Sequence, residues 1–232
     1  MKFFLAAIIA ISVGLINPIT TFAASSMDVI AFQAQMGELN RLKPLQNPRN
    51  EAAKDILKRT VIDRENKVVG EINDVLINDK AQVSSIFAVF DRLQFTDGVY
   101  LNYQTLNVTN SSNGYKLGLN ADEVVSSYPE LLANIETASG GESGIVSAKS
   151  ILGREVIGSN GIKIGRISEI LFDQGGAYVR GIYVNVDYRA IRNRGVAVPF
   201  SAFKFTKQYG RLVASIDQDY ADAIVLYAKD NL

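Results

Sequence analysis

The chain repeats itself along most of its 232 residues. Four blocks in the first half match four blocks in the second half, in the same order and 95 to 97 residues apart. The matched blocks are 56–62 with 151–157, 70–78 with 165–173, 83–88 with 179–184, and 98–103 with 195–200. The spacing grows by one residue at two places, and both fall in predicted turns, where insertions cost little. A repeat of this length predicts two copies of one structural unit.

Each copy has the sequence pattern of a small, mainly β unit. In the second copy, short apolar or alternating runs are separated by Gly, Asn and Asp residues, which is typical of strands joined by tight turns. The predicted strands are 154–157, 163–172, 178–186, 195–200 and 212–216. A capped helix is predicted over 220–229, and its counterpart in the first copy begins at Asn120 and runs through Leu132. We therefore predict two tandem small β-barrels, each with a short C-terminal helix.

The repeat also predicts the domain boundaries. Domain 1 covers residues 56–136 and domain 2 covers residues 151–232, with a helical lead-in and linker over 24–55. Residues 137–150 include the run Ser-Gly-Gly-Glu-Ser-Gly, a composition that is typical of a flexible linker.

A further helix is predicted over residues 27–42. Apolar side chains recur there at spacings of three and four, which gives one apolar stripe: Val29, Phe32, Met36 and Leu39. Pro44 and Pro48 end the pattern. An isolated amphipathic helix of this length is marginal in water, so its stripe must be covered. It packs either on the barrels of its own chain or on a partner or second copy.

The N-terminus has the pattern of an export signal. Lys2 precedes an almost unbroken apolar run over 3–16, and small residues around Ala23 suit a signal peptidase. The run is shorter than the roughly 20 residues of a membrane-spanning helix. We predict a signal peptide over 1–23, cut near Ala23, and a periplasmic or secreted protein. A retained N-terminal anchor is the alternative.

The composition excludes several kinds of chemistry. The chain has no histidine and no cysteine, so it lacks a Ser-His-Asp triad, a Cys-His pair and a zinc site of nitrogen and sulfur ligands. Acidic residues gather at Asp63, Glu65, Glu71 and Asp74, but their spacing matches no calcium loop. We interpret them as solvated charges. We therefore predict no catalytic residue, no metal site and no cofactor.

One motif resembles a known family. Residues 164–173 read Ile-Gly-Arg-Ile-Ser-Glu-Ile-Leu-Phe-Asp, and after a glycine-containing turn and an apolar strand, residues 196–200 read Val-Ala-Val-Pro-Phe. This pattern resembles the PRC-barrel family over 151–227 and more weakly over 56–132, where Asn102 stands in place of Pro199. Gly70 and Gly165 fall where the family needs a close approach between strands. The resemblance implies small barrels that dock onto other macromolecules, with no substrate and no cofactor.

The highest concentration of charge lies in the second copy. Four arginines are flanked by three tyrosines there: Arg180, Arg189, Arg192 and Arg194, with Tyr178, Tyr183 and Tyr188. Arg and Tyr are enriched in interface hot spots, so we predict partner binding by Arg180, Tyr188, Arg189, Arg192 and Arg194. The patch would face an acidic protein surface or, more weakly, lipid headgroups. A hairpin tip kept soluble by its charge is the alternative.

The favoured function is that of an exported, non-catalytic binding or scaffold protein. The chain has 24 basic and 24 acidic residues, and this balance argues against a nucleic-acid partner. A hydrolase of cell-wall sugars that works through two carboxylates is one alternative. A self-associating envelope or stress protein, a homodimer through the lead-in helix, is another.

Overall fold

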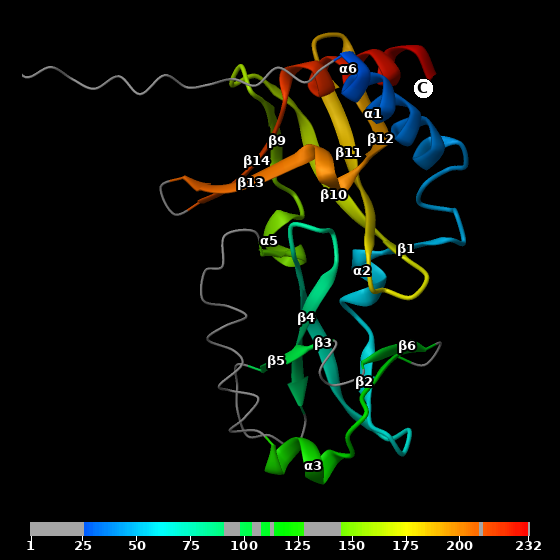
Figure 1. Cartoon of the computed structure of the whole chain (residues 1–232), viewed down its shortest axis with the longest axis vertical. Coiled ribbons are helices and arrows are strands. Elements are labelled where there is room, and N and C mark those ends of the chain that lie inside the picture. Colours follow the sequence, from blue (N-terminus) through cyan, green and yellow to red (C-terminus); the bar gives the residue numbers. More distant parts are fainter. Residues whose placement is uncertain are drawn as a thin grey trace, which may run out of the picture.

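A computed structural model describes residues 26–90, 98–103, 108–111, 114–127, 145–208 and 211–231. The predicted signal peptide over 1–23 and residues 137–144 of the predicted linker lie outside these residues. Figure 1 shows two curled sheets along the long axis of the molecule, with α1 and α6 at one end.

The first half of the chain forms one antiparallel sheet with a single parallel pair. Its strands are β2 (Thr60–Ile62), β3 (Val68–Ile77), β4 (Val83–Phe90), β5 (Val99–Asn102), β6 (Thr109–Ser111) and β7 (Gly114–Lys116). They lie in the order β5-β4-β3-β2-β7-β6, and β2 runs parallel to β7. Helix α3 (Ala121–Ser126) follows, and Asn120 and Glu123 cap it reciprocally through side chain and backbone.

The second half forms a sheet of the same strand order. Its strands are β9 (Glu155–Gly158), β10 (Lys163–Asp173), β11 (Val179–Tyr188), β12 (Ile191–Val198), β13 (Phe203–Gln208) and β14 (Arg211–Ile216). They lie in the order β12-β11-β10-β9-β14-β13, and β9 runs parallel to β14. A short 3-10 helix, η1 (Phe200–Ala202), joins β12 to β13, and α6 (Gln218–Asn231) ends the described chain.

The mainly β architecture predicted from the sequence is confirmed. Both sheets curl into half-barrels, and a C-terminal helix follows the second. Strand β13 was not among the predicted strands, because its residues carry no Gly or Asn turn before them. The 3-10 turn after Pro199 takes the place of such a signal.

Helix α1 (Ser26–Asn40) packs on the second sheet and on α6. Phe32 and Met36 of its apolar stripe are buried, and the ring of Phe32 stacks on that of Tyr220 with centroids 4.4 Å apart. At the helix end, the Asn40 side chain accepts from the backbone N–H of Ala197 (2.9 Å) and donates to the Ala197 carbonyl (2.7 Å). The lead-in helix therefore covers the edge of β12 in its own chain.

The two halves exchange short segments. Strand β1 (Asn50–Ala52) precedes the first sheet in the chain but pairs with β10 of the second sheet. Strand β8 (Val146–Ser147) precedes the second sheet but pairs with β3 of the first. Ala52 lies opposite Leu171, and Ser147 lies opposite Leu76. In the 95-residue repeat, Ser147 corresponds to Ala52 and Leu171 corresponds to Leu76. The exchange is therefore reciprocal.

Further backbone contacts between the halves follow the same symmetry. The N–H of Val83 donates to the Ala177 carbonyl (2.8 Å), and the N–H of Val179 donates to the Ala81 carbonyl (2.7 Å). Short helices α2 (Ala53–Ile56) and α5 (Ala148–Ile151) follow β1 and β8. These contacts join the halves through their backbones as well as their side chains.

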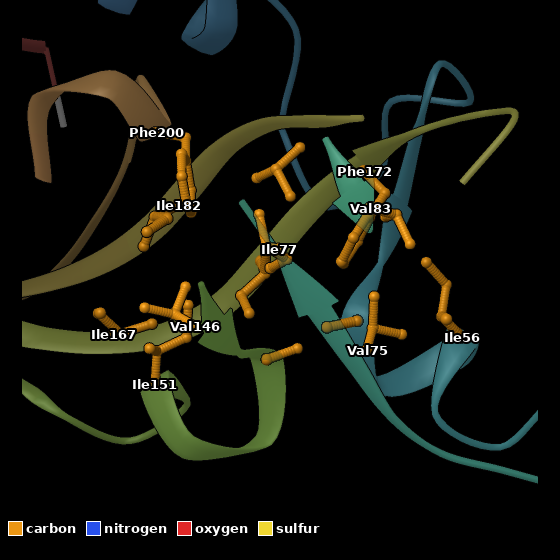
Figure 2. Packing of buried hydrophobic residues seen from close by; sticks show 14 of the residues in the cluster. Ile56, Val75, Ile77, Val83, Val146, Ile151, Ile167, Phe172, Ile182 and Phe200 are labelled. Carbon is orange, nitrogen blue, oxygen red and sulfur yellow. The ribbon is translucent and has the colours of Figure 1, made fainter. Parts of the chain in front are cut away.

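One hydrophobic core runs through both halves. Figure 2 shows side chains of the first half, among them Ile56, Ile77 and Val83, in the same cluster as Ile151 and Phe172 of the second. Ile56 and Ile151 come from the two short helices of the exchanged segments, and both are fully buried. The exchange therefore places apolar side chains of each half next to the other half's sheet.

The flexible linker predicted over 137–150 needs a correction at its described end. Residues 146–147 form β8 and residues 148–151 form α5, and Val146, Ala148 and Ile151 are buried. Burial of these three side chains orders the segment, although its neighbours in sequence are rich in Gly and Ser. The linker prediction for 137–144 falls outside the described residues.

Candidate partner-binding surface

Most of the residues predicted to bind a partner lie at the end of the hairpin between β11 and β12. We call residues 187–194 the arginine-rich tip. The two strands pair from Ile182 opposite Val198 as far as Tyr188 opposite Ile191. Arg189 and Asn193 adopt left-handed backbone conformations, with φ of 53° and 52°. Such φ values cost little for Asn and more for Arg, so the turn is held by its flanking strands. The tip is therefore a structured element of the sheet.

Tyr188 fixes the base of this tip. Its side chain is half-buried against the hydrophobic core, as is that of Ile191 opposite to it. The guanidinium carbon of Arg189 lies 5.0 Å from the centre of the Tyr188 ring, within the range of a cation–π contact. The Tyr188 ring therefore packs on the core and also holds the guanidinium of Arg189.

The other tip arginines are exposed. Arg192 forms an ion pair with Asp187 (2.6 Å), and at least half of each side chain is exposed, so the pair contributes little to stability. Arg194 lies opposite Val186 and is also exposed. The tip therefore presents three arginines and one aspartate to solvent.

Tyr183 supports the hairpin further down. Its hydroxyl lies over Gly195 of β12, where a Cβ atom would be only 2.0 Å from it. Burial raises the pKa of the Tyr183 phenol. Its ring takes the place of a side chain on the facing strand. Tyr183 therefore has a packing role and does not belong to the exposed tip.

Arg180 does not join this patch. It lies at the opposite end of β11 from Tyr188, eight residues away, which corresponds to roughly 26 Å along a strand. Its guanidinium donates to the Asn50 side chain (2.9 Å), so it holds β1 against β11 and β10. Tyr178, half of whose surface is exposed, also lies at that end. Closeness in sequence made these residues look like one cluster, but the length of the strand separates them.

The acidic residues of the first half do not form one site either. Asp63 and Asp74 are buried, so the interpretation of all four as solvated charges is wrong for these two. Asp63 accepts from the backbone N–H groups of Glu65 and Lys67, both at 2.8 Å, and so closes the turn between β2 and β3. A carboxylate that accepts backbone N–H groups can be buried because its charge stays hydrogen-bonded.

Asp74 and Glu169 hold the exchanged segments. Asp74 accepts from Ser147 and from the backbone N–H of Lys149 (3.0 Å), at the start of α5. Glu169 accepts from the backbone N–H of Lys54 (3.4 Å), at the start of α2. The two carboxyl groups are 95 residues apart, as are the two lysines. The repeat could have pointed to this role, but Glu169 was not among the residues predicted from the sequence.

Burial raises the pKa of the Glu169 carboxyl above its ordinary value of 4.5. The backbone N–H groups of Ile170 (3.0 Å) and Lys54, together with the charge of Lys54, act in the opposite direction but do not cancel this effect. These contacts are structural, because both are made to backbone N–H groups that hold α2 and β10 in place.

The described parts of the chain contain no metal centre, and they contain a small polar cavity. No group of three or more Asp or Glu side chains in these parts is placed to hold a metal ion. A cavity of about 90 Å³ is lined by Asp63, Glu65, Lys67, Val68, Val69, Asn120, Ala121 and Asp122. Among the described helices, none is long and apolar enough to cross a membrane.

The comparison with protein families gives a match within the second half of the chain. Residues 143–221 match the model of the PRC-barrel domain. The match covers β8, α5 and strands β9 to β14 with the arginine-rich hairpin tip, and it ends inside α6. No curated protein matches the chain.

Proposed function

We propose that this protein, which contains a PRC-barrel domain at residues 143–221, is a non-catalytic scaffold that docks onto a partner protein through that domain. A PRC-barrel domain suggests a role in protein interaction or as a scaffold. The single observation that carries the proposal is the exposed arginine tip of the β11–β12 hairpin, with Arg189 held over the half-buried Tyr188. Aromatic and Arg side chains so arranged are the usual anchors of protein interfaces.

The charge of the tip indicates an acidic partner surface. Arg189, Arg192 and Arg194 outnumber Asp187, and all four are exposed. Guanidinium groups pair with carboxylates in a planar, two-bonded geometry, so an acidic protein surface offers the tip suitable partners. We include Tyr188 as the support of the site and leave Arg180 out of it.

We further propose that residues 56–136 are a second, diverged copy of the domain. The repeated blocks of sequence and the common strand order of the two sheets support this. The first copy has Asn102 in place of Pro199, and residues 91–97, which align with the arginine-rich tip, contain one arginine, Arg92, and two aspartates in the sequence, so we expect the copies to use different surfaces.

Export is the third part of the proposal. The apolar run over 3–16 and the small residues near Ala23 support a cleavable signal. The intact mass of the protein from the periplasmic or secreted fraction should correspond to a chain that starts at Ala24 or Ser25. A mass of the full chain in that fraction would contradict cleavage.

The docking proposal is tested by crosslinking in intact cells, followed by affinity purification and identification of the captured proteins. The triple variant Arg189→Ser, Arg192→Ser, Arg194→Ser should reduce recovery of the main partner at least tenfold. The matched control Arg64→Ser, Arg154→Ser, Arg166→Ser removes the same charge from exposed positions elsewhere and should leave recovery unchanged. Equal recovery with both triple variants would overturn the assignment of the tip.

A further inference from the structure

A second surface, distinct from the arginine-rich tip, lies between the two long helices that pack on the second half. Helices α1 and α6 pack side by side at one end of the molecule (Figure 1). The groove between them has a volume of about 540 Å³. It is lined by Val29, Ile30, Gln33, Asp219, Asp222, Ala223 and Leu226.

The floor of this groove is apolar and accessible. Ile30 is 66% exposed and Leu226 is 52% exposed, among the largest values for apolar side chains in the described chain. Ile30 faces away from the core, because Phe32 and Met36 of the same helix cover the sheet with its other face. Accessible apolar side chains gathered in one groove favour a site of interaction.

The spacing of the lining residues suits a helical ligand. On α6 they stand at positions i, i+3, i+4 and i+7, from Asp219 to Leu226, and on α1 they occupy one turn. A third helix can lie in the groove between two packed helices, with its own apolar side chains three and four residues apart. The lined length of α6 is about 10 Å, which accommodates roughly two turns of such a helix.

The charge of the two helices selects among the candidate ligands. Helix α1 contains two acidic residues and no basic one, and α6 contains three acidic residues and one basic one. Asp219 and Asp222 stand at the groove itself. An acidic rim repels an anionic lipid surface, and it repels the same face of a second copy. It attracts a segment that carries Lys and Arg beside its apolar side chains.

We propose that the groove between α1 and α6 is a docking site for a cationic amphipathic helix of a partner protein. Ile30 and Leu226 would contact the apolar side chains of that helix, and Asp219 and Asp222 would pair with the basic side chains at its flanks. The site is separate from the arginine-rich tip, which requires an acidic partner surface.

The test uses the purified protein and two synthetic peptides of about 18 residues that share a helical pattern of Leu. One carries Lys at the other positions and the other carries Glu. Fluorescence anisotropy should show binding of the Lys peptide and at least tenfold weaker binding of the Glu peptide. The variants Ile30→Ser with Leu226→Ser, and Asp219→Asn with Asp222→Asn, should each weaken binding of the Lys peptide about tenfold. Equal binding of both peptides, or unchanged binding by both double variants, would overturn the proposal.

Two control variants show whether the Lys peptide binds in this groove and not elsewhere on the protein. Val68→Ser with Val125→Ser removes two exposed apolar side chains from the first half and should leave binding unchanged. The triple arginine variant of the hairpin tip should also bind the Lys peptide normally, so failure of one proposal leaves the other standing. A dimer mass that the change Ile30→Ser with Leu226→Ser converts to a monomer mass would overturn the proposal in favour of a second copy.

Discussion

At the scale of single residues, two glycines determine how closely the long strands can approach. A Cβ atom at Gly70 would lie 2.2 Å from the Val89 carbonyl oxygen, and one at Gly165 would lie 2.4 Å from that of Asn185. Backbone atoms of a paired strand cannot move away without breaking ladder hydrogen bonds. The close approach expected at both positions is thus confirmed, and no larger residue fits at either.

The change Gly165→Ala should destabilise the protein by about 2–3 kcal/mol, the cost of forcing an extra methyl group into a filled space. Urea unfolding followed by circular dichroism measures the free energy of unfolding. Gly37→Ala is the matched control, because nothing lies within 4 Å of its Cβ position in α1. That change should instead stabilise the helix by about 0.5–1 kcal/mol. A small effect at Gly165 would mean that the strands are not so close.

The raised pKa of Glu169 predicts how stability depends on pH. Burial favours the protonated carboxyl in the folded protein. The contribution of Glu169 to the free energy of unfolding is therefore fully present below the ordinary pKa of a glutamate. It is lost as the pH rises through the raised pKa. Glu169→Gln keeps an oxygen that can accept from Ile170 and Lys54. As the pH rises from about 4 to about 7, the free energy of unfolding of the variant should increase relative to that of the wild type.

Glu155 provides a contrast of opposite sign. Its hydrogen bond and ion pair with Lys163 (2.7 Å) lower the pKa of its carboxyl. Its contribution is present above the ordinary pKa and is lost as the pH falls through the lowered value. The group is exposed, so Glu155→Gln should produce only a small change in the free energy of unfolding, confined to acid pH.

For Glu169→Gln, a pH profile parallel to that of the wild type would contradict burial as the dominant cause of the raised pKa of Glu169.

At the scale of elements, one side chain joins α1 to the edge of β12. Asn40 makes both a donor and an acceptor contact with the backbone of the fully buried Ala197. Asn40→Ala would leave that N–H and that carbonyl without their partner, at a cost of about 1–3 kcal/mol. Hydrogen exchange should show faster exchange in α1 than in the wild type. Gln35→Ala, at an exposed position of the same helix, should change neither stability nor exchange.

Local sequence signals identified many of the elements. The turn at 159–161 and the long apolar run after it correctly predicted β9 and β10, and the apolar stripe of 27–42 correctly predicted α1. Strands β1 and β8 carry no such signal, since they are two or three residues long and pair with the other half of the chain. Pairing at that distance depends on the tertiary fold, which periodicity does not report.

The candidate site was predictable only in part. Arg189, Arg192 and Arg194 lie on one hairpin tip as the sequence suggested, because a tight turn keeps neighbours in sequence together. Arg180 was grouped with them by sequence distance, but an extended strand carries it to the other end of the sheet. The groove between α1 and α6 was missed, because its two walls come from opposite ends of the described chain.

At the scale of the whole molecule, the halves cannot move as independent bodies, because each completes the other's sheet through β1 and β8. A protease site inserted among residues 137–144 provides a test. After cleavage, the two fragments should elute together in size-exclusion chromatography and separate only in urea. Urea unfolding of the uncut protein should show one cooperative transition. Fragments that separate in native buffer would contradict the locked arrangement.

The reciprocal exchange also imposes an order on synthesis. The first sheet lacks β8 until the ribosome has made Ser147, which follows Ile77 by 70 residues. At roughly 5–20 residues per second, this delay is about 4–14 s. During that interval Leu76 and Ile77, at the C-terminal end of β3, lack β8 as their partner and are open to other extended chains. Pairing of β10 with β1 is not delayed in this way, because β1 is synthesised long before β10. A nascent chain stalled before Val146 should therefore be more sensitive to protease than one stalled after α6.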